Sequence, residues 1–175
     1  RFITQADTIG ILVMVNGVVG SNNYRKLDPQ EFRGFALSDD IAPLVFINGA
    51  DTKAAQMFTL AHEISHIWLG NSALSDAEAS EIPNNETEQW CNKVAAEILV
   101  PLEVIRKEYR KDNPLPMEMQ RLAKYFKVST LVILRRIHDA GGLSQNQMWQ
   151  AYNNEKQRLQ KMPGGSGGDF YLTQI

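Results

Sequence analysis

The sequence has a single cysteine, no long hydrophobic run and almost no excess charge. Cys91 has no partner within the chain, which excludes an internal disulfide and makes a reducing, cytoplasmic location the expectation. The longest apolar runs, such as Ile11 to Val15, fall far short of the roughly 18 residues that a membrane-spanning helix requires, so no membrane partner is expected. Eighteen Lys and Arg against twenty Asp and Glu give a net charge of -2, which excludes a general basic field for nucleic acid.

What the sequence does contain is enough apolar material for one ordinary domain plus a small appendage. Its 175 residues are 43% hydrophobic and 22% charged, values typical of folded globular proteins. The chain begins at Arg1 without a methionine and closes with the strand-like stretch 170–175, which follows the glycine-rich segment 163–168. We therefore expect a fragment of a longer protein, with a flexible linker near its end.

Apolar patterning and turn residues predict strands in the first part of the chain and helices in the rest. Strands are predicted over 9–19, with a turn at Asn16-Gly17, and over 35–37 and 44–47 as a short antiparallel pair. A largely buried helix is predicted over 51–69, capped by Asp51, and a second over 85–100, capped by Asn85. Four more helices are predicted over 102–110, 114–126, 130–140 and 144–161, while 71–85 is predicted to be a loop.

The most informative stretch is His62-Glu63-Ile64-Ser65-His66, which holds two of the three histidines. Four residues make about one helical turn, so both imidazoles project from one face and can bind one metal ion, with Glu63 beside them. The neighbouring residues are mostly apolar, and two imidazoles and a carboxylate without a partner would be costly there. The motif therefore predicts a metal site rather than a chance pair of packed histidines.

A catalytic zinc normally takes three protein ligands and leaves one position for water, so a third ligand is needed. The metzincin pattern requires Gly and His where this chain has Leu69 and Ser72, which excludes that class. The remaining histidine, His138, belongs to a basic helix and fits a surface or packing role better. Cys91 could bind zinc, but a lone helical cysteine fits a small buried side chain better.

Three glutamates on the helix after the motif are better placed as the third ligand. Glu88 is favoured, because Cys91, Ala95 and Leu99 follow it at helical spacing and set it at one end of the buried stripe. Glu97 is a rival, and Glu86 fits a role at the helix N-terminus. The residues alone leave this choice open.

Two stretches of the sequence resemble the ImmA/IrrE family of metallo-endopeptidases. They are Phe58-Thr59-Leu60-Ala61-His62-Glu63-Ile64-Ser65-His66 and the run from Glu88 to Pro101, a glutamate followed by a helix with Ala-Ala, paired aliphatics and a proline. The resemblance extends over about residues 9–140. It implies His62, His66 and Glu88 as metal ligands and Glu63 as the catalytic acid/base. Cys91 and Val94 depart from the family pattern, where an alanine and an aromatic residue are usual.

A zinc ion in such a site lowers the pKa of bound water towards about 7 and polarises the substrate carbonyl. Glu63 would then take the proton of the water and pass it to the leaving amine, so that a peptide bond is cut. The sequence does not exclude another divalent metal, such as manganese, in place of zinc. The group that stabilises the oxyanion is not indicated by spacing, and Tyr24, Arg33, Tyr109 and His138 are all candidates.

Residues 119–138 read as helix, tight turn and helix, with apolar positions where a helix-turn-helix would bury them. Five basic residues (Arg121, Lys124, Lys127, Arg135 and Arg136) give this segment a local positive charge. Leu131 and Val132 stand where a recognition helix would place polar, base-reading residues, which disfavours DNA contact.

We therefore predict an α+β, zincin-like domain over residues 1–112, with a small antiparallel sheet and two metal-binding helices. A helix-turn-helix-like module over 113–142 and a polar helix with a linker over 143–175 follow it. The resemblance implies a zinc-dependent endopeptidase whose protein substrate is a transcriptional repressor of the helix-turn-helix type, cleaved in a stress response or mobile-element transfer.

The sequence leaves two alternative functions and one hypothesis about the substrate. A non-catalytic module that binds a regulator or DNA on a peptidase scaffold is the main alternative. A deformylase is disfavoured because no cysteine precedes His62. The acidic segment from Asp76 to Glu88 suggests a preference for basic substrate segments, and unchanged kinetics on a basic peptide after substituting Asp76, Glu78 and Glu81 by Ser would remove that hypothesis.

Overall fold

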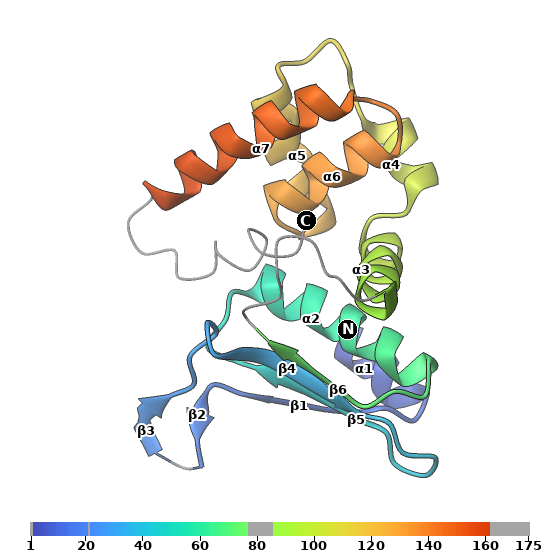
Figure 1. Cartoon of the computed structure of the whole chain (residues 1–175), viewed down its shortest axis with the longest axis vertical. Coiled ribbons are helices and arrows are strands. Elements are labelled where there is room, and N and C mark those ends of the chain that lie inside the picture. Colours follow the sequence, from blue (N-terminus) through green and yellow to red (C-terminus); the bar gives the residue numbers. More distant parts are fainter. Residues whose placement is uncertain (1, 21, 77–85, 162–175) are drawn as a thin grey trace.

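The first half of the chain forms a four-stranded mixed sheet with helix α2 (Lys53–Trp68) packed on it, and the second half is helical (Figure 1). The structure is a computed structural model that describes residues 2–20, 22–76 and 86–161. The strands are β1 (Leu12–Asn16), β4 (Phe32–Leu37), β5 (Leu44–Asn48) and β6 (Ala73–Asp76), in the order β1-β5-β4-β6. The predicted linker 163–168 and tail 170–175, as well as Asn85 and most of the acidic segment, lie outside the described residues.

The strand directions correct the predicted antiparallel sheet. β5 pairs antiparallel with β4, as expected, but it pairs parallel with β1, with Leu12 opposite Leu44 and Asn16 opposite Asn48. Between β1 and β4 the chain makes the small antiparallel hairpin of β2 (Val18–Val19) and β3 (Asn22–Lys26), which projects from the sheet (Figure 1). This excursion lets the chain enter β4 in the opposite direction, so that β5 returns parallel to β1.

Besides strand β3 of the hairpin, two elements were not predicted. Residues 73–76 form the edge strand β6, antiparallel to β4, where a loop was expected. The short helix α1 (Phe2–Thr8) precedes the sheet and buries Ala6. Both are short segments that gain their order from the sheet beside them, because isolated strands and one- or two-turn helices are marginal in water.

Helix α2 (Lys53–Trp68) lies across one face of the sheet and carries the HExxH motif (Figure 1). Leu60 and Ile64 of α2 pack on Val45 and Ile47 of β5, in a small core that also holds Ala6 and Ile11. The helix lies close against the sheet at Gly34 of β4, where a Cβ atom would lie 2.6 Å from Thr59 Cγ2 and 2.7 Å from the Phe46 carbonyl oxygen. Only glycine allows this close approach.

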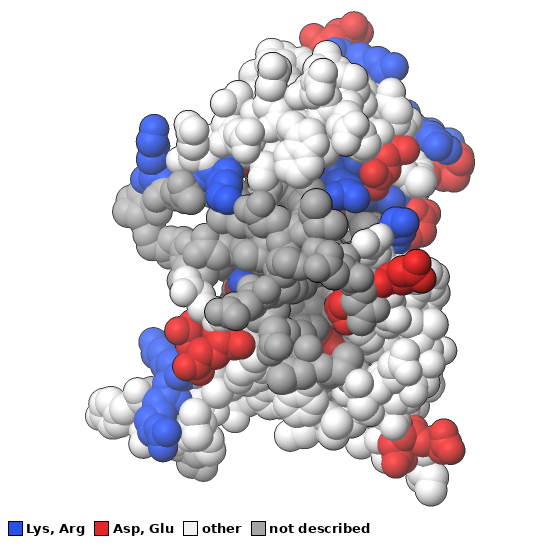
Figure 2. Space-filling model, viewed as in Figure 1, with Lys and Arg blue, Asp and Glu red and all other residues white. Residues whose placement is uncertain are grey.

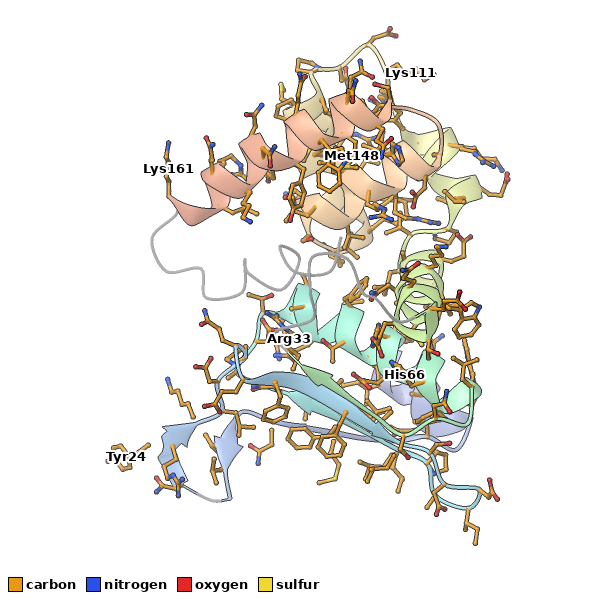
Figure 3. All side chains as sticks on the ribbon, viewed as in Figure 1. Tyr24, Arg33, His66, Lys111, Met148 and Lys161 are labelled. Atoms are coloured by element: carbon orange, nitrogen blue, oxygen red, sulfur yellow. The ribbon has the colours of Figure 1, made fainter. Side chains whose placement is uncertain are left out.

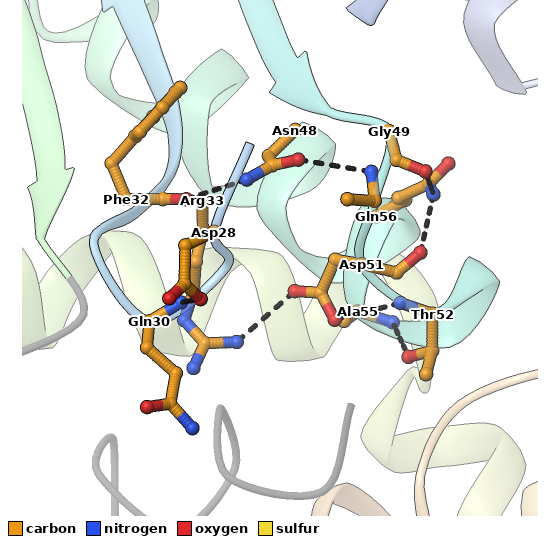
Figure 4. Close-up of polar contacts among 11 residues, drawn as sticks. Asp28, Gln30, Phe32, Arg33, Asn48, Gly49, Asp51, Thr52, Ala55 and Gln56 are labelled. Carbon is orange, nitrogen blue, oxygen red and sulfur yellow. Dashed lines mark hydrogen bonds and ion pairs between the residues drawn. The ribbon is translucent and has the colours of Figure 1, made fainter. Parts of the chain in front are cut away.

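The start of α2 is held by a buried polar network rather than by the predicted cap (Figure 4). The N-cap is Thr52, whose side chain accepts a hydrogen bond from the Ala55 amide. Asp51 instead forms a buried ion pair with Arg33, with 3.1 Å between Nη1 and Oδ2. Gln56 donates to the carbonyls of Gly49 and Asp51 at 3.0 and 2.6 Å. These contacts tie the first turn of α2 to strand β4 and to the end of β5.

The remaining helices begin and end within two residues of the predicted bounds. They are α3 (Glu86–Leu99), α4 (Leu102–Glu108), α5 (Leu115–Phe126), α6 (Thr130–Asp139) and α7 (Gln145–Gln160). The predicted cap of α3, Asn85, lies outside the described residues. One core cluster runs from Ala55 and Phe58 of α2 through these helices to Met148 and Tyr152 of α7. It crosses both predicted domain boundaries, at 112 and 142, so the division into three units stays a prediction. None of the described helices has the length and apolar composition that a bilayer crossing requires.

Helices α5 and α6, joined by a short turn, occupy the segment that was predicted to be helix-turn-helix-like, and that assignment stays a prediction. The turn uses Lys127 in the left-handed conformation, at a φ of 61°, and Ser129 caps α6 by accepting from the Val132 amide. Leu131 and Val132, at the N-terminal end of α6, are buried. The face shown in Figure 2 has basic and acidic side chains interspersed along the helical part. The two positions where a recognition helix would read bases thus hold apolar, buried side chains in this chain.

The start of α5 depends on one buried carboxylate, Glu118. It accepts hydrogen bonds from the Arg110 amide, the Asn113 side chain and the Arg121 guanidinium, at distances from 2.6 to 3.1 Å. The hydrogen bonds from Arg121, followed by those from Asn113 and Arg110, outweigh the effect of burial and lower the pKa of Glu118 from 4.5 to about 2.

We expect Glu118→Gln to lower the free energy of unfolding at pH 7 by about 2–3 kcal/mol. Because the carboxylate is ionised more easily in the folded chain, its contribution is complete above pH 4.5 and is lost as the pH falls towards 2. Urea unfolding between pH 3 and 7 measures both effects. The control is Glu108→Gln, since Glu108 is part-exposed and 3.7 Å from Arg121. An equal loss in both variants would contradict the assignment.

Candidate metal centre

Packing of α3 against α2 brings one carboxylate onto the two histidines of the motif. The Nε2 atoms of His62 and His66 are 3.1 Å apart. The carboxylate of Glu88, on α3, faces both of them, with Oε2 3.1 Å from Nε2 of His62 and Oε1 3.1 Å from Nε2 of His66. The two imidazoles are almost fully buried, whereas 30% of the Glu88 side chain is exposed. Among the described residues this is the group of His, Cys, Asp and Glu side chains close enough to hold a metal ion.

The donor set fits zinc. Ligands at 2.0–2.1 Å from a tetrahedral ion stand about 3.3 Å from one another, close to the 3.1 Å separations seen here. Two imidazole nitrogens and one carboxylate oxygen are also the ligand types of catalytic zinc sites, which keep a fourth position open. The Glu88 side chain is 30% exposed, so solvent reaches the carboxylate side of the cluster.

The electrostatics of the three side chains favour a bound cation. Burial opposes ionisation of Glu88, but hydrogen bonds from His62 and His66 and their charges outweigh it, so the pKa of Glu88 is lowered. Burial also opposes protonation of His66, yet Cys91 and Glu88 together raise the pKa of that imidazole. The buried cluster thus carries a negative carboxylate and attracts positive charge, which a divalent metal supplies more fully than a proton.

Asn92 sets the orientation of His62. Its Oδ1 lies 2.9 Å from Nδ1 of His62, and an amide oxygen can only accept, so Nδ1 carries the proton and Nε2 keeps its lone pair for a metal. The ring of Phe58 also stacks with that of His62, with centroids 6.4 Å apart. Asn92 follows Glu88 by one helical turn, so one face of α3 supplies both a ligand and the partner of another ligand.

We expect Asn92→Ala to weaken zinc binding about 10- to 100-fold, because loss of a hydrogen bond to a ligating imidazole has effects of this size. Asn92→Asp, which keeps an acceptor at the same place, should bind zinc at least as well as the unchanged chain. Competition with a zinc-binding dye measures both. Equal weakening by Ala and Asp would show that the effect is not transmitted through the acceptor.

Glu63 is fully buried on α2 between the two histidines in sequence. It lies towards the sheet, since its Cγ would be 3.6 Å from a Cβ atom placed on Gly34. The close approach at Gly34 therefore borders the general base that the sequence predicts. Sequence analysis singled out neither Gly34 nor Asn92, although the spacing of Asn92 from Glu88 placed it on the same face of the helix.

The rival ligand candidates lie elsewhere. Glu86 is exposed in the first turn of α3. Glu97 pairs with the buried guanidinium of Arg136 and accepts from the Leu102 amide. His138 lies on α6, 3.5 Å from Asp139. Cys91 is buried beside His66 but is not part of the three-residue cluster.

Three of the four oxyanion candidates lie away from the cluster or are engaged in other contacts. Tyr24 is 98% exposed on the projecting hairpin, far from His66 in Figure 3. The Arg33 guanidinium binds Asp51 at the start of α2. Tyr109 packs in the helical core, where Gly142 leaves room for its ring. The group that stabilises an oxyanion is thus not identified among them.

Comparisons with known proteins agree with this geometry. Residues 6–138 match the peptidase M78 family, described as the IrrE N-terminal-like domain. The radiation response metalloprotease IrrE of Deinococcus radiodurans is 38% identical to this chain over 91 residues, which cover 49% of the chain and 28% of that protein. The aligned part thus spans little more than a quarter of that relative. Because the family match covers most of the sequence and includes the His-His-Glu cluster, the chain belongs to the peptidase M78 family of metalloproteases.

Proposed function

We propose that this chain is a zinc-dependent endopeptidase with His62, His66 and Glu88 as metal ligands and Glu63 as general base. The observation that carries the proposal is the set of 3.1 Å separations that joins the two Nε2 atoms to each other and each of them to one oxygen of Glu88, beside the buried carboxylate of Glu63. Zinc is preferred over manganese because two of the three donors are imidazoles and the separations suit tetrahedral rather than octahedral geometry.

A zinc ion bound there would lower the pKa of a water molecule and polarise the carbonyl of the scissile peptide. Glu63 accepts the proton of the attacking water and delivers it to the amine that leaves. Asn92 holds His62 in the tautomer that can bind metal. The close contact of Gly34 with α2 keeps the segment that carries Glu63 fixed against the sheet.

For the substrate we propose a transcriptional repressor of the helix-turn-helix type. The resemblance to repressor-cleaving peptidases supports this choice. The relative in Deinococcus radiodurans is named for a radiation response, which fits a regulatory protease better than a digestive one.

The test is incubation of the purified, zinc-analysed chain with candidate repressors from the same genome. We expect one zinc per chain and a discrete cut in one repressor, abolished by a chelator and restored by zinc. Mass spectrometry of the fragments identifies the bond. A cut that survives complete removal of metal would refute the proposal.

A further inference from the structure

A pocket of about 610 Å³ lies between α3 and the helices α6 and α7, next to the metal centre. Its wall includes Asn92 and Phe58, the two side chains that contact the imidazole of His62. The pocket therefore begins one side chain away from the proposed ligands. Its volume lies in the range of sites that bind compact ligands, about 300–1,000 Å³.

The pocket is long enough for a short peptide segment. Its α3 wall runs from Gln89 to Glu97, nine residues whose eight helical steps rise about 12 Å along the helix axis. An extended chain advances about 3.3–3.6 Å per residue, so three to four substrate residues match this length. The other walls combine apolar side chains (Leu102, Leu131, Val132, Met148 and Trp149) with polar ones from α6 and the start of α7.

The charges of the pocket favour an acidic partner. Three basic residues (Lys93, Arg135 and Arg136) and two acidic ones (Glu97 and Asp139) line it. Arg136 is buried, and its guanidinium is held by Glu97, Asp139 and the Val100 carbonyl. The carboxylate of Asp139 is shared by two arginines, with Oδ2 3.5 Å from Nη1 of Arg136 and Oδ1 3.7 Å from Nε of Arg135. Lys93 is exposed and forms no ion pair within the described ranges. Lys93 and Arg135 are thus the cations available to a ligand.

We propose that this pocket binds the substrate polypeptide beside the scissile bond, taking a bulky apolar side chain next to an acidic one. The inference rests on the proposed peptidase function and names its substrate class. The apolar side chain packs between Phe58, Val132 and Trp149. The acidic residue pairs with Lys93 and Arg135.

The test uses the full chain carrying Glu63→Gln and loaded with zinc, so that peptides bind without being cut. Peptides selected from a random library on this protein should combine an aromatic or large aliphatic residue with Asp or Glu within about three positions. Ala96→Phe adds a ring to the pocket wall and should weaken their binding about tenfold to a hundredfold, the value of one buried apolar side chain. Ile98→Phe is the matched control, since Ile98 is exposed on the same helix and outside the lining.

A second pair of variants tests the charge. Lys93→Glu should weaken binding about three- to tenfold, less at high salt, because exposed charges are screened. Lys111→Glu makes the same change on the loop before α5, far from His66 in Figure 3, and should have no effect. Circular dichroism and zinc content establish that each variant is folded.

The outcomes separate the pocket from the activity. If Ala96→Phe and Lys93→Glu bind the selected peptides as well as their controls do, or if no peptides are selected, the inference is overturned. If the active chain cuts peptides with no dependence on Ala96 or Lys93, the pocket assignment fails and the peptidase stands. If the selected peptides depend on both residues but the active chain never cuts them, the pocket stands and the peptidase function fails.

Discussion

Replacing Glu63 by Gln is expected to lower the rate of peptide cleavage about a thousandfold or more while zinc remains bound. An amide has nearly the shape of the carboxylate but cannot accept the proton of the attacking water, and general base catalysis contributes about 10²–10⁴ in rate. Glu63 is fully buried, so the isosteric change is the one least disruptive to packing. Single-turnover cleavage at saturating enzyme and metal analysis of the same sample measure both quantities.

The control is Glu103→Gln, because Glu103 is exposed on α4, with 76% of its side chain accessible. It should retain full activity. Undiminished cleavage by Glu63→Gln would remove Glu63 as the base. Undiminished gene regulation by a Glu63→Gln chain that no longer cuts would instead support a non-catalytic module that binds a regulator.

His66→Ala and Glu88→Gln are each expected to weaken zinc binding about a hundredfold to a thousandfold. A zinc site is worth roughly 10–16 kcal/mol over about four ligands, so loss of one costs roughly 3–4 kcal/mol. Glu88→Gln also removes the ionised carboxylate that lies 3.1 Å from both imidazoles. Affinity is measured by competition with chelators of known strength, and cleavage at limiting free zinc should fall in parallel.

Glu86→Gln is the matched control, since Glu86 lies two residues before Glu88 but is exposed. Its zinc affinity should be that of the unchanged chain. A larger loss in Glu86→Gln than in Glu88→Gln would assign the third ligand to Glu86. Full zinc affinity in His66→Ala and Glu88→Gln, as in the control Glu86→Gln, would exclude the cluster as the zinc site.

Most of the helical part could be predicted from the sequence because its signals are local. Ser129 and Ser144 each accept a hydrogen bond from an amide three residues later, and the predicted bounds of α6 and α7 lie within one residue of those in the structure. Caps and apolar spacing act over one or two turns, so a sequence window contains them.

The sheet was predicted less well because strand pairing joins distant residues. The parallel contact of β1 with β5 links Leu12 to Leu44, and no local pattern states that direction. Strand β6 pairs with β4 across about 40 residues, and its four-residue segment was predicted to be a loop. Asp51 was predicted to cap α2, but Arg33, 18 residues earlier, takes its carboxylate and leaves the cap to Thr52.

The sequence by itself determined that His62 and His66 face the same way, because four residues of helix return to one face whatever surrounds them. It also determined the helix that carries them. Only the tertiary structure decided which carboxylate meets the pair, since Glu86, Glu88 and Glu97 share one helix and the packing of α3 on α2 selects Glu88. The pocket beside Asn92 likewise exists only because the fold places α6 and α7, about 35 to 60 residues further along the chain, opposite α3.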